Sequence, residues 1–443
     1  MEKMDKMMKK TILPLAAAFI FGVLLASAPW HPSGEAREDT DTYRQLDLFG
    51  NVFERVRRSY VEEVEDGSLI QDAINGMLQS LDPHSAYLTP DDFLDMQEQT
   101  RGTFGGLGIE VTMDMGFVKV ITPIDDTPAQ RAGLITGDYI THLDGVPIQG
   151  MTLSEAVDVM RGPVDTSIVL TVVREGVDAP FEVPIIRDII TIRSVRTERE
   201  GDIAYIRLTT FRTDVSEKIR EAIVDLRGEI GEENLIGYVL DLRNNPGGLL
   251  DEAIAVSNIF LDRGEIVSTR GRDHSDADRY NATPGDFIGG KPLVILINGG
   301  SASASEIVAA AMQDHRRGSV LGTRSFGKGS VQTLIPLGDE GALRLTTALY
   351  YTPSGETIQA HGVEPDIEIE QPVEDPSQAR ITGEAELPQY IKRDSEEDND
   401  DKVKDEKGRP KSGSASFVPF EKEDDIQLLR ALELLREMKR NSG

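Results

Sequence analysis

The stretch "PLVILINGGSASASEIVAAAM" (292–312) joins an apolar run typical of a buried strand to an apolar run typical of a buried helix. The tripeptide Asn-Gly-Gly (298–300) indicates a sharp turn between them, and Ser301, Ser303 and Ser305 follow it with only alanine in between. Serine is a preferred N-cap residue, so helix capping alone can explain such serines. The free amides at a helix N-terminus also favour developing negative charge, so the same turn is a candidate site for chemistry.

Strand-like runs alternate with helical segments on both sides of this stretch, which indicates a mixed α/β fold with a largely parallel sheet. Ligands of open α/β sheets collect at the carboxyl ends of the strands, where the turn at 298–300 is expected. The runs that carry this pattern are "IAYIRLTTF", "VSEKIREAIVDLRGE", "LIGYVLDLRNN", "LLDEAIAVSNIFL" and "GSVLGT".

A chain of 443 residues exceeds what one hydrophobic core usually holds, so several domains are expected. Composition and periodicity predict an export signal or membrane anchor (1–30), an N-terminal helical segment (40–100), a β-rich module (101–188), an α/β core (189–371), an acidic disordered linker (372–415) and a C-terminal amphipathic helix (416–443). In the closing helix, one apolar face is expected to pack on the body of the protein or on a second copy, through Ile426, Leu429, Leu432, Leu435 and Met438.

The N-terminus resembles an export signal. The basic sequence "MEKMDKMMKK" precedes an apolar run at residues 11–28, in the order of the n-region and h-region of a signal peptide. The run is also just long enough to span a bilayer, and Pro29 follows the small residues 26–28 directly, so cleavage and retention as a membrane tether both stay open. In either case the rest of the chain is expected outside the cytoplasm, in a periplasmic or other extracytoplasmic space.

The composition argues against several classes of function. The formal net charge is −30, from 77 acidic and 47 basic residues, so nucleic acid is not expected as a partner. Cysteine is absent, which excludes a disulfide framework, a thiolate nucleophile and a cysteine zinc site. The six histidines form no HExxH or similar pattern, so no metal or cofactor is expected.

The β-rich module has the pattern of a peptide-binding domain. "GLGI" precedes an expected strand, and "AGLITGDYITHLDG" and "LSEAVDVMRG" follow at the spacings of a PDZ domain, which the module closely resembles. The resemblance implies a peptide C-terminus as ligand, held by the amides of Leu107, Gly108 and Ile109. The peptide would add to the following strand, with the helix at 153–160 as the other wall. Arg161 is expected to sense the carboxylate, to link the module to its neighbour, or to be solvated.

A second stretch, "GTRSFGKGSVQTLIPL" (322–337), offers the base that a serine nucleophile needs. Lys328 lies among glycines and a phenylalanine, where burial would lower the pKa of its amine and let it accept a proton. Alternation along the expected strand places residues 328, 330 and 332 on one face, so that Gln332 can orient the amine.

Together these motifs resemble those of the carboxy-terminal processing proteases, or tail-specific proteases, which carry a Ser–Lys dyad. The match covers residues 45–370 and the closing helix, with "LDPHSAYL", the PDZ-like module, "DLRNNPGGLL", "GSASASEI" and "RSFGKGSVQ" in the family's order. The resemblance implies a serine endopeptidase that recognises protein C-termini, needs no cofactor and forms homodimers or larger homo-oligomers through its terminal helices.

The resemblance also assigns roles to individual residues, and for the oxyanion hole the sequence does not decide between two glycines. The roles are nucleophile for Ser303, general base for Lys328, support of the base for Gln332, oxyanion hole for Ala304 with Gly247 or Gly248, and coupling of peptide binding to activation for Arg161.

Three other interpretations stay open. A catalytically silent scaffold would use the PDZ-like module alone. Ser325 and Lys328 form an S-x-x-K pair as in penicillin-binding enzymes, although the neighbouring glycines indicate a loop rather than the helix start that such a pair needs. A triad through His315 is less favoured because "MQDHRRG" is typical of a helix end, where the histidine neutralises the helix dipole. His84 and His361 are expected to be structural.

Overall fold

The computed structural model describes residues 35–124, 126–191, 193–273, 277–373, 383–392 and 414–442. The predicted export segment at 11–28 and most of the predicted acidic linker lie outside the described residues. Within the described ranges, no helix has the length and apolar character needed to cross a membrane. The chain separates into two units, residues 1–73 and 74–443.

The first unit contains α2 (Glu35–Ser59) and the beginning of α3 (Asp66–Gln79), where a helical segment was predicted. Three apolar side chains at helical spacing on α2 are exposed, namely Leu46 (59%), Phe49 (51%) and Val56 (37%). The described residues of the first unit therefore leave the apolar face of α2 largely uncovered.

The β-rich module is a sheet of the order β3-β4-β5-β7-β8, with β6 paired to β5 and a separate ribbon of β2 and β9. Its own core contains Val118, Ile140 and Leu170. Its elements are β2 (Thr103–Gly106), β3 (Ile109–Asp114), β4 (Phe117–Pro123), α5 (Pro128–Arg131), β5 (Tyr139–Leu143), β6 (Val146–Pro147), α6 (Leu153–Met160), β7 (Ser167–Val173), β8 (Phe181–Ile186) and β9 (Asp188–Thr191).

The central sheet of the α/β core has the order β10-β11-β12-β15-β16-β19. From β11 onward every neighbouring pair is parallel, as predicted, and β10 pairs antiparallel with β11. β12 (Gly237–Asp241) and β15 (Leu293–Ile297) are buried at every residue, which explains their almost unbroken apolar sequences. The remaining strands are β10 (Val195–Glu200), β11 (Ile203–Leu208), β16 (Ser319–Gly322) and β19 (Ile367–Glu368).

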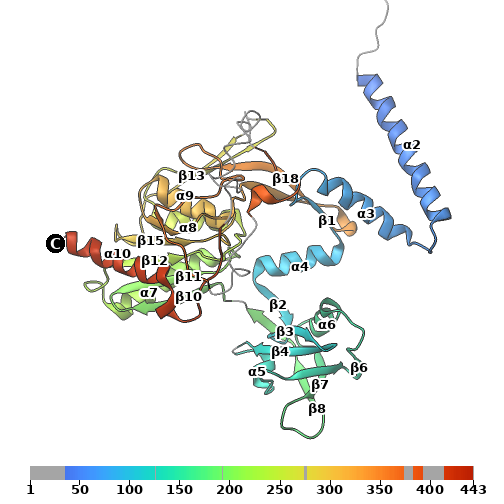
Figure 1. The fold of residues 1–443 in the computed structure, drawn as a ribbon, viewed down its shortest axis with the longest axis horizontal. Helices are drawn as coiled ribbons and strands as arrows, with labels where there is room; N and C mark the ends of the chain where they lie inside the picture. Colours follow the sequence, from blue (N-terminus) through green and yellow to red (C-terminus); the bar gives the residue numbers. More distant parts are fainter. Residues whose placement is uncertain are drawn as a thin grey trace, which may run out of the picture. The chain divides into compact units, whose positions relative to one another are not determined.

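Helices cover both faces of this sheet (Figure 1). α7 (Val215–Ile230), α8 (Leu250–Phe260) and α9 (Ala304–Asp314) share one apolar core with one face. α10 (Ile426–Ser442) packs on the other face, so the closing helix lies on the body of its own chain.

The buried face of α10 is shifted from the predicted one. Ile426 and Leu429 are 44% and 46% exposed. A spacing of three residues drifts around a helix of about 3.6 residues per turn, so the five predicted positions cannot all face the sheet. The side chains that do so keep to one stripe: Leu428, Ala431, Leu432 and Leu435.

A second, antiparallel sheet has the order β1-β18-β13-β14, with β17 also paired to β18. α4 (Pro90–Arg101) follows β1, and the Thr89 hydroxyl caps it by accepting the amide N–H of Asp92. The strands are β1 (Ala86–Leu88), β13 (Glu265–Gly271), β14 (Ala277–Asn281), β17 (Ser330–Pro336) and β18 (Ala342–Tyr351). Short 3-10 helices are η1 (Gly338–Glu340), η3 (Glu384–Glu386) and η4 (Lys422–Asp424).

Three loops meet at the carboxyl edge of the central sheet. β12, β15 and β16 are parallel neighbours, so the loops at 242–249, 298–303 and 323–329 all start at this edge. The turn that follows β15 therefore lies where ligands of open α/β sheets collect, as the sequence predicted.

Candidate active site

The three serines of the 298–312 stretch have different environments. The Ser301 hydroxyl donates to the Leu242 carbonyl and the Ser305 hydroxyl donates to the Asn245 carbonyl, each at 2.8 Å. Both serine side chains are fully buried, so they fasten the turn to the loop that follows β12. Ser303 is the N-cap residue of α9 and makes neither contact. Ser301 and Ser305 therefore have structural roles, whereas the Ser303 hydroxyl does not fasten the turn.

The backbone of Ser303 is unusual. Its φ of 54° and ψ of −114° are rarely adopted by residues with a side chain, and such strain is concentrated at functional sites. Sequence reasoning missed its neighbour Tyr350 on β18. Burial raises the pKa of the Tyr350 hydroxyl to about 12, and a hydrogen bond with the Ser303 side chain acts in the opposite direction.

A buried carboxylate joins the serine turn to the loop that carries the lysine. Oε2 of Glu306 accepts the amide N–H of Ser303 at 2.7 Å and that of Lys328 at 2.9 Å. Its Oε1 accepts the Ser325 hydroxyl at 2.5 Å and the Gly327 amide at 2.7 Å. The backbones of the predicted nucleophile and the predicted base are thus brought to one oxygen atom.

Glu306 is a residue that the sequence analysis missed, although it is fully buried. Burial raises the pKa of its carboxyl to about 7, against the opposite effect of the four hydrogen bonds that it accepts. Its position three residues after Ser303 matches the capping-box pattern, which would have been the available signal.

Lys328 lies in the loop at 323–329, as predicted from the glycines around it. Burial lowers the pKa of its amine below the ordinary value, which is the change that a lysine base requires. The largest opposing effect is attraction by the Glu384 carboxylate, and the other charges that act on the amine belong to Arg344, Glu306 and Asp82.

The competing arrangements are not supported by the geometry. Ser325 lies in a loop, where its hydroxyl donates to Glu306 and accepts the Val363 amide at 2.6 Å. His315 is the C-cap residue of α9, and its Nε2 lies 2.7 Å from the Glu265 carbonyl oxygen. Ser325 and His315 therefore have structural partners, and His315 lies at the helix end that the sequence indicated.

The loop after β12 packs Gly247 against the serine turn and Gly248 against Phe211. A Cβ at Gly247 would lie 2.8 Å from the Ala302 carbonyl oxygen and 2.9 Å from the Ala304 nitrogen, so only glycine allows this approach. The Gly247 amide donates to Asn245 Oδ1 at 2.9 Å. The amides of Gly248 and Ala304 donate to no other residue of the described chain.

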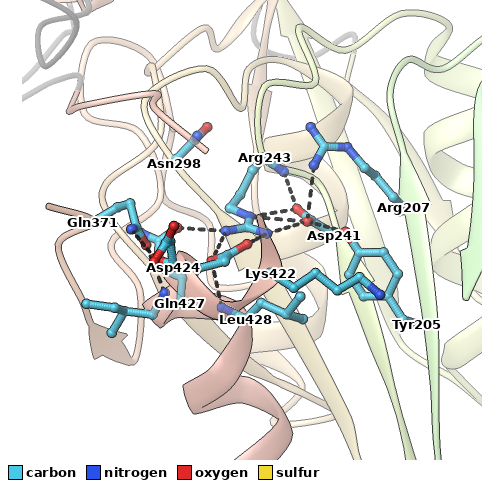
Figure 2. A network of polar contacts seen from close by, with 12 residues as sticks. Tyr205, Arg207, Asp241, Arg243, Asn298, Gln371, Lys422, Asp424, Gln427 and Leu428 are labelled. Atoms are coloured by element: carbon cyan, nitrogen blue, oxygen red, sulfur yellow. Dashed lines mark hydrogen bonds and ion pairs between the residues drawn. The ribbon is translucent and has the colours of Figure 1, made fainter. Parts of the chain in front are cut away.

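Figure 2 shows a buried ion-pair network at the start of this loop. The Arg243 side chain, 1% exposed, lies 2.7 Å from Asp241 and 2.8 Å from Asp425 at the start of α10. The Tyr205 hydroxyl donates to Asp241 at 2.7 Å. Burial alone would lower the pKa of Arg243, but the two carboxylates raise it well above its ordinary value, so the guanidinium stays charged.

Gln332 lies on β17, but the strand does not alternate regularly from Lys328. β17 begins at Ser330, and a bulge between Val331 and Gln332 shifts the pairing register. The Gln332 amide donates to Ser330 Oγ at 2.9 Å and to Thr346 Oγ1 at 3.3 Å. Its support of the lysine stays a prediction.

A separate groove lies on the β-rich module. A pocket of roughly 100 Å³ is lined by residues of β3, α6 and the preceding loop, and all four residues predicted to bind peptide contribute to it. β3 has a paired neighbour on one side only, within the described residues, so its other edge is open. The lining residues are Phe104, Gly106, Leu107, Gly108, Ile109, Val111, Val157, Met160 and Arg161.

Arg161 connects this pocket to the neighbouring helix α4. Its Nη1 lies 3.1 Å from Asp95 Oδ1, and its guanidinium lies 5.2 Å from the centre of the Phe104 ring. Its Nε is buried without a hydrogen-bond partner among the described residues. These contacts favour a linking role over a solvated side chain.

Comparison with known proteins identifies the family. The chain matches "Peptidase family S41" over residues 202–369, "PDZ domain" over 120–174 and "Activating protease CtpB N-terminal domain" over 27–91. It is 52% identical over 432 residues to the carboxy-terminal-processing protease of Bartonella bacilliformis, which covers 97% of this chain and 96% of that protein.

One further relative and one solved structure are more distant. The carboxy-terminal processing protease CtpA of Bacillus subtilis is 33% identical over 330 residues, which cover 74% of this chain and 70% of that protein. The solved photosystem II D1 C-terminal processing protease is 31% identical, with a TM-score of 0.44, and the match covers 73% of this chain and 92% of that chain. Because half of the residues are shared with a relative over almost the whole length, the chain belongs to peptidase family S41 and is a C-terminal processing serine protease with a PDZ domain.

Proposed function

We propose that Ser303 is the nucleophile of this protease and Lys328 its general base. The observation that carries the proposal is the shared oxygen of Glu306, which accepts the backbone amides of both residues. Burial lowers the pKa of Lys328 and so favours the neutral amine that can accept a proton. The strained backbone of Ser303 at the start of α9 also supports a functional role for this residue.

The proposed reaction is acyl transfer. The Lys328 amine takes the proton of the Ser303 hydroxyl as Oγ attacks the scissile carbonyl, and the resulting ammonium group then protonates the leaving amine. Water, deprotonated by the same amine, hydrolyses the acyl-enzyme and restores the hydroxyl. Gln332 is proposed to support the amine through the network that its own amide forms with Ser330 and Thr346.

The oxyanion hole is proposed to use the amides of Ala304 and Gly248. Both amides are without an accepting partner in the described chain, whereas the Gly247 amide already donates to Asn245. Gly247 then has a steric role, because its hydrogen side chain allows the two loops to approach. Each oxyanion donor is worth about 3 kcal/mol in other hydrolases.

The substrate C-terminus is proposed to bind between β3 and α6. The amides of Leu107, Gly108 and Ile109 would receive the carboxylate, and the peptide would pair with the open edge of β3. The largely apolar pocket beside them favours an apolar last residue. Arg161 is proposed to couple the binding of a peptide in the groove to activation of the α/β core, through its contact with Asp95.

Location and assembly are further proposals. The basic and apolar sequence of residues 1–28 supports export to an extracytoplasmic space, with or without a retained membrane tether. The exposed apolar face of α2 supports a homodimer or larger homo-oligomer.

A cleavage assay tests this function. One folded protein substrate is compared with the same protein lacking its last few residues, using the wild type, Ser303→Ala and Lys328→Ala. We expect the wild type to cleave the intact substrate faster and both variants to lose cleavage by at least about 1,000-fold, as when other catalytic nucleophiles are removed. Undiminished cleavage by Ser303→Ala would refute the proposed nucleophile.

A further inference from the structure

Residues 383–392 form a short packed segment, although they fall inside the stretch predicted to be an acidic linker. Its η3 turn lies directly on the lysine loop, because the Glu384 amide donates to the Phe326 carbonyl at 3.0 Å. The Glu384 side chain is fully buried, which is unusual for a carboxylate that is not paired. A buried carboxylate needs hydrogen-bond or charged partners, and those of Glu384 indicate its role.

The partners of Glu384 enclose the lysine loop from its other end. The side-chain NH2 group of Gln359 donates to Glu384 Oε1 at 3.1 Å, and the side-chain Oε1 of Gln359 accepts the Gly329 backbone amide at 2.9 Å. Glu384 is thus tied to Phe326, two residues before Lys328, and through Gln359 to Gly329, one residue after it. Glu384 therefore holds the lysine loop before Lys328 through its backbone amide and after Lys328 through its side chain and Gln359.

His84 completes the environment of this carboxylate. Its Nε2 lies 3.0 Å from Oε1 and 2.9 Å from Oε2 of Glu384. The backbone around His84 is itself fixed, since its amide donates to Asp82 at 2.8 Å and its carbonyl accepts Arg344 Nε at 3.0 Å. The "LDPHSAYL" motif thereby supplies one wall of the lysine site.

We propose that Glu384 is a positioning residue of the catalytic centre, which holds the loop at 326–329 and places a negative charge beside the Lys328 amine. This inference rests on the proposed role of Lys328 as the base. The charged and titratable groups that face the amine are Glu384, Arg344, Glu306 and Asp82, with His84 behind Glu384. Among them Glu384 exerts the largest charge effect on Lys328.

The two functions of Glu384 can be separated by substitution. Glu384→Gln removes the charge but keeps Oε1, which accepts both Gln359 and His84. Glu384→Ala removes the charge and these hydrogen bonds. The carboxylate attracts the protonated amine and so raises the pKa of Lys328 against the larger effect of burial. Without that charge the pKa of Lys328 falls, so the amine loses its proton at a lower pH. The neutral base is then present at pH values where the wild-type lysine is still protonated.

The experiment is the pH dependence of kcat on a peptide substrate for the wild type, Glu384→Gln and Glu384→Ala. We expect Glu384→Gln to move the acid limb to lower pH, raising the ratio of kcat at about pH 6 to kcat at about pH 9 several-fold. Glu384→Ala should lose up to about 100-fold of kcat at every pH, because the base is misplaced. An acid limb of Glu384→Gln at the wild-type pH, or a wild-type kcat of Glu384→Ala, would overturn the inference.

Two controls make the result specific. Glu386→Gln removes the same charge from the same 3-10 helix, two residues further on, and should leave the acid limb where it is in the wild type. Lys328→Ala tests the underlying function: if it retains cleavage, the dyad itself is wrong. If Lys328→Ala is inactive while Glu384→Gln keeps the wild-type profile, only the positioning role of Glu384 fails. Thermal melting of each variant confirms that it is folded.

Discussion

At the scale of single residues, the catalytic geometry depends on how buried carboxylates are satisfied. All four groups that contact Glu306 donate to it, so the ionised form fits its surroundings although burial opposes it. An amide at this position could not serve all of them, because its NH2 group would face at least one backbone N–H. Glu306 is therefore a link between the serine turn and the lysine loop that no isosteric neutral side chain can replace.

Glu306→Gln should accordingly lower both stability and rate. We expect the free energy of unfolding to fall by about 1–3 kcal/mol, the cost of one unsatisfied buried donor. We expect kcat to fall by about 10- to 100-fold because the two loops separate slightly. Denaturant unfolding and peptide cleavage measure the two effects. Glu364→Gln, whose side chain is 71% exposed, is the matched control and should change stability by less than about 0.5 kcal/mol.

Much of this site could be predicted from sequence because the decisive signals are local. The serine turn between a strand and a helix and the glycines around Lys328 are both contained within short windows. The surroundings of the lysine could not be predicted in the same way. His84 and Glu384 are 300 residues apart, and Glu384 lies in a polar stretch whose composition gives no sign of burial. Only the folded chain brings such groups together.

At the scale of elements, α10 packs on the central sheet through apolar side chains, and an ion pair at its start joins it to the loop at 242–249. Arg243 lies in the loop that leads to Gly247 and Gly248, and Asp425 directly precedes α10. The two are joined by a bidentate contact, with both distances 2.8 Å, between side chains that are 1% and 5% exposed. The closing helix therefore supports the loop on which the proposed oxyanion hole depends, 182 residues earlier in the chain.

Asp425→Asn tests this link. The substitution leaves Arg243 with one charged partner fewer and turns an NH2 group towards the guanidinium, so we expect a loss of about 3–5 kcal/mol of stability, as for other broken buried ion pairs. Turnover should fall with it, because the loop loses its anchor. Asp424→Asn is the adjacent control: Asp424 is exposed, and the hydrogen bonds recorded for it use its backbone, whose carbonyl accepts Gln371 and whose amide donates to the Glu421 carbonyl. Equal melting temperatures for the two variants would speak against the link.

At the scale of the whole molecule, the proposed recognition groove and the proposed catalytic centre lie on different cores within one chain. The pocket of the PDZ domain belongs to one apolar cluster, and the serine turn belongs to another. Arg161 contacts Asp95 on α4, outside the domain that carries the pocket. The proposed tail-binding residues and the proposed hydrolytic residues are therefore different, which makes the two proposed roles separable by mutation.

Gly108→Ala should remove recognition while leaving hydrolysis intact. Gly108 has a φ of 78°, and a Cβ there would lie 2.3 Å from the Thr127 Cβ, so alanine must displace the loop that presents the amides to the substrate carboxylate. Gly116→Ala is the control, because Gly116 has a φ of 79° and nothing within 4 Å of the added carbon. Both variants carry the backbone strain of about 1 kcal/mol, but only the first has the clash.

The measurement is kcat/KM for a protein substrate with its C-terminal tail and for the same protein without it. In Gly108→Ala the ratio of the two values should fall towards one, while labelling of Ser303 by a fluorophosphonate proceeds at the wild-type rate. In Gly116→Ala the wild-type ratio should persist. A wild-type ratio in Gly108→Ala would mean that the tail is recognised elsewhere, and a loss of labelling would mean that this loop also supports the catalytic centre.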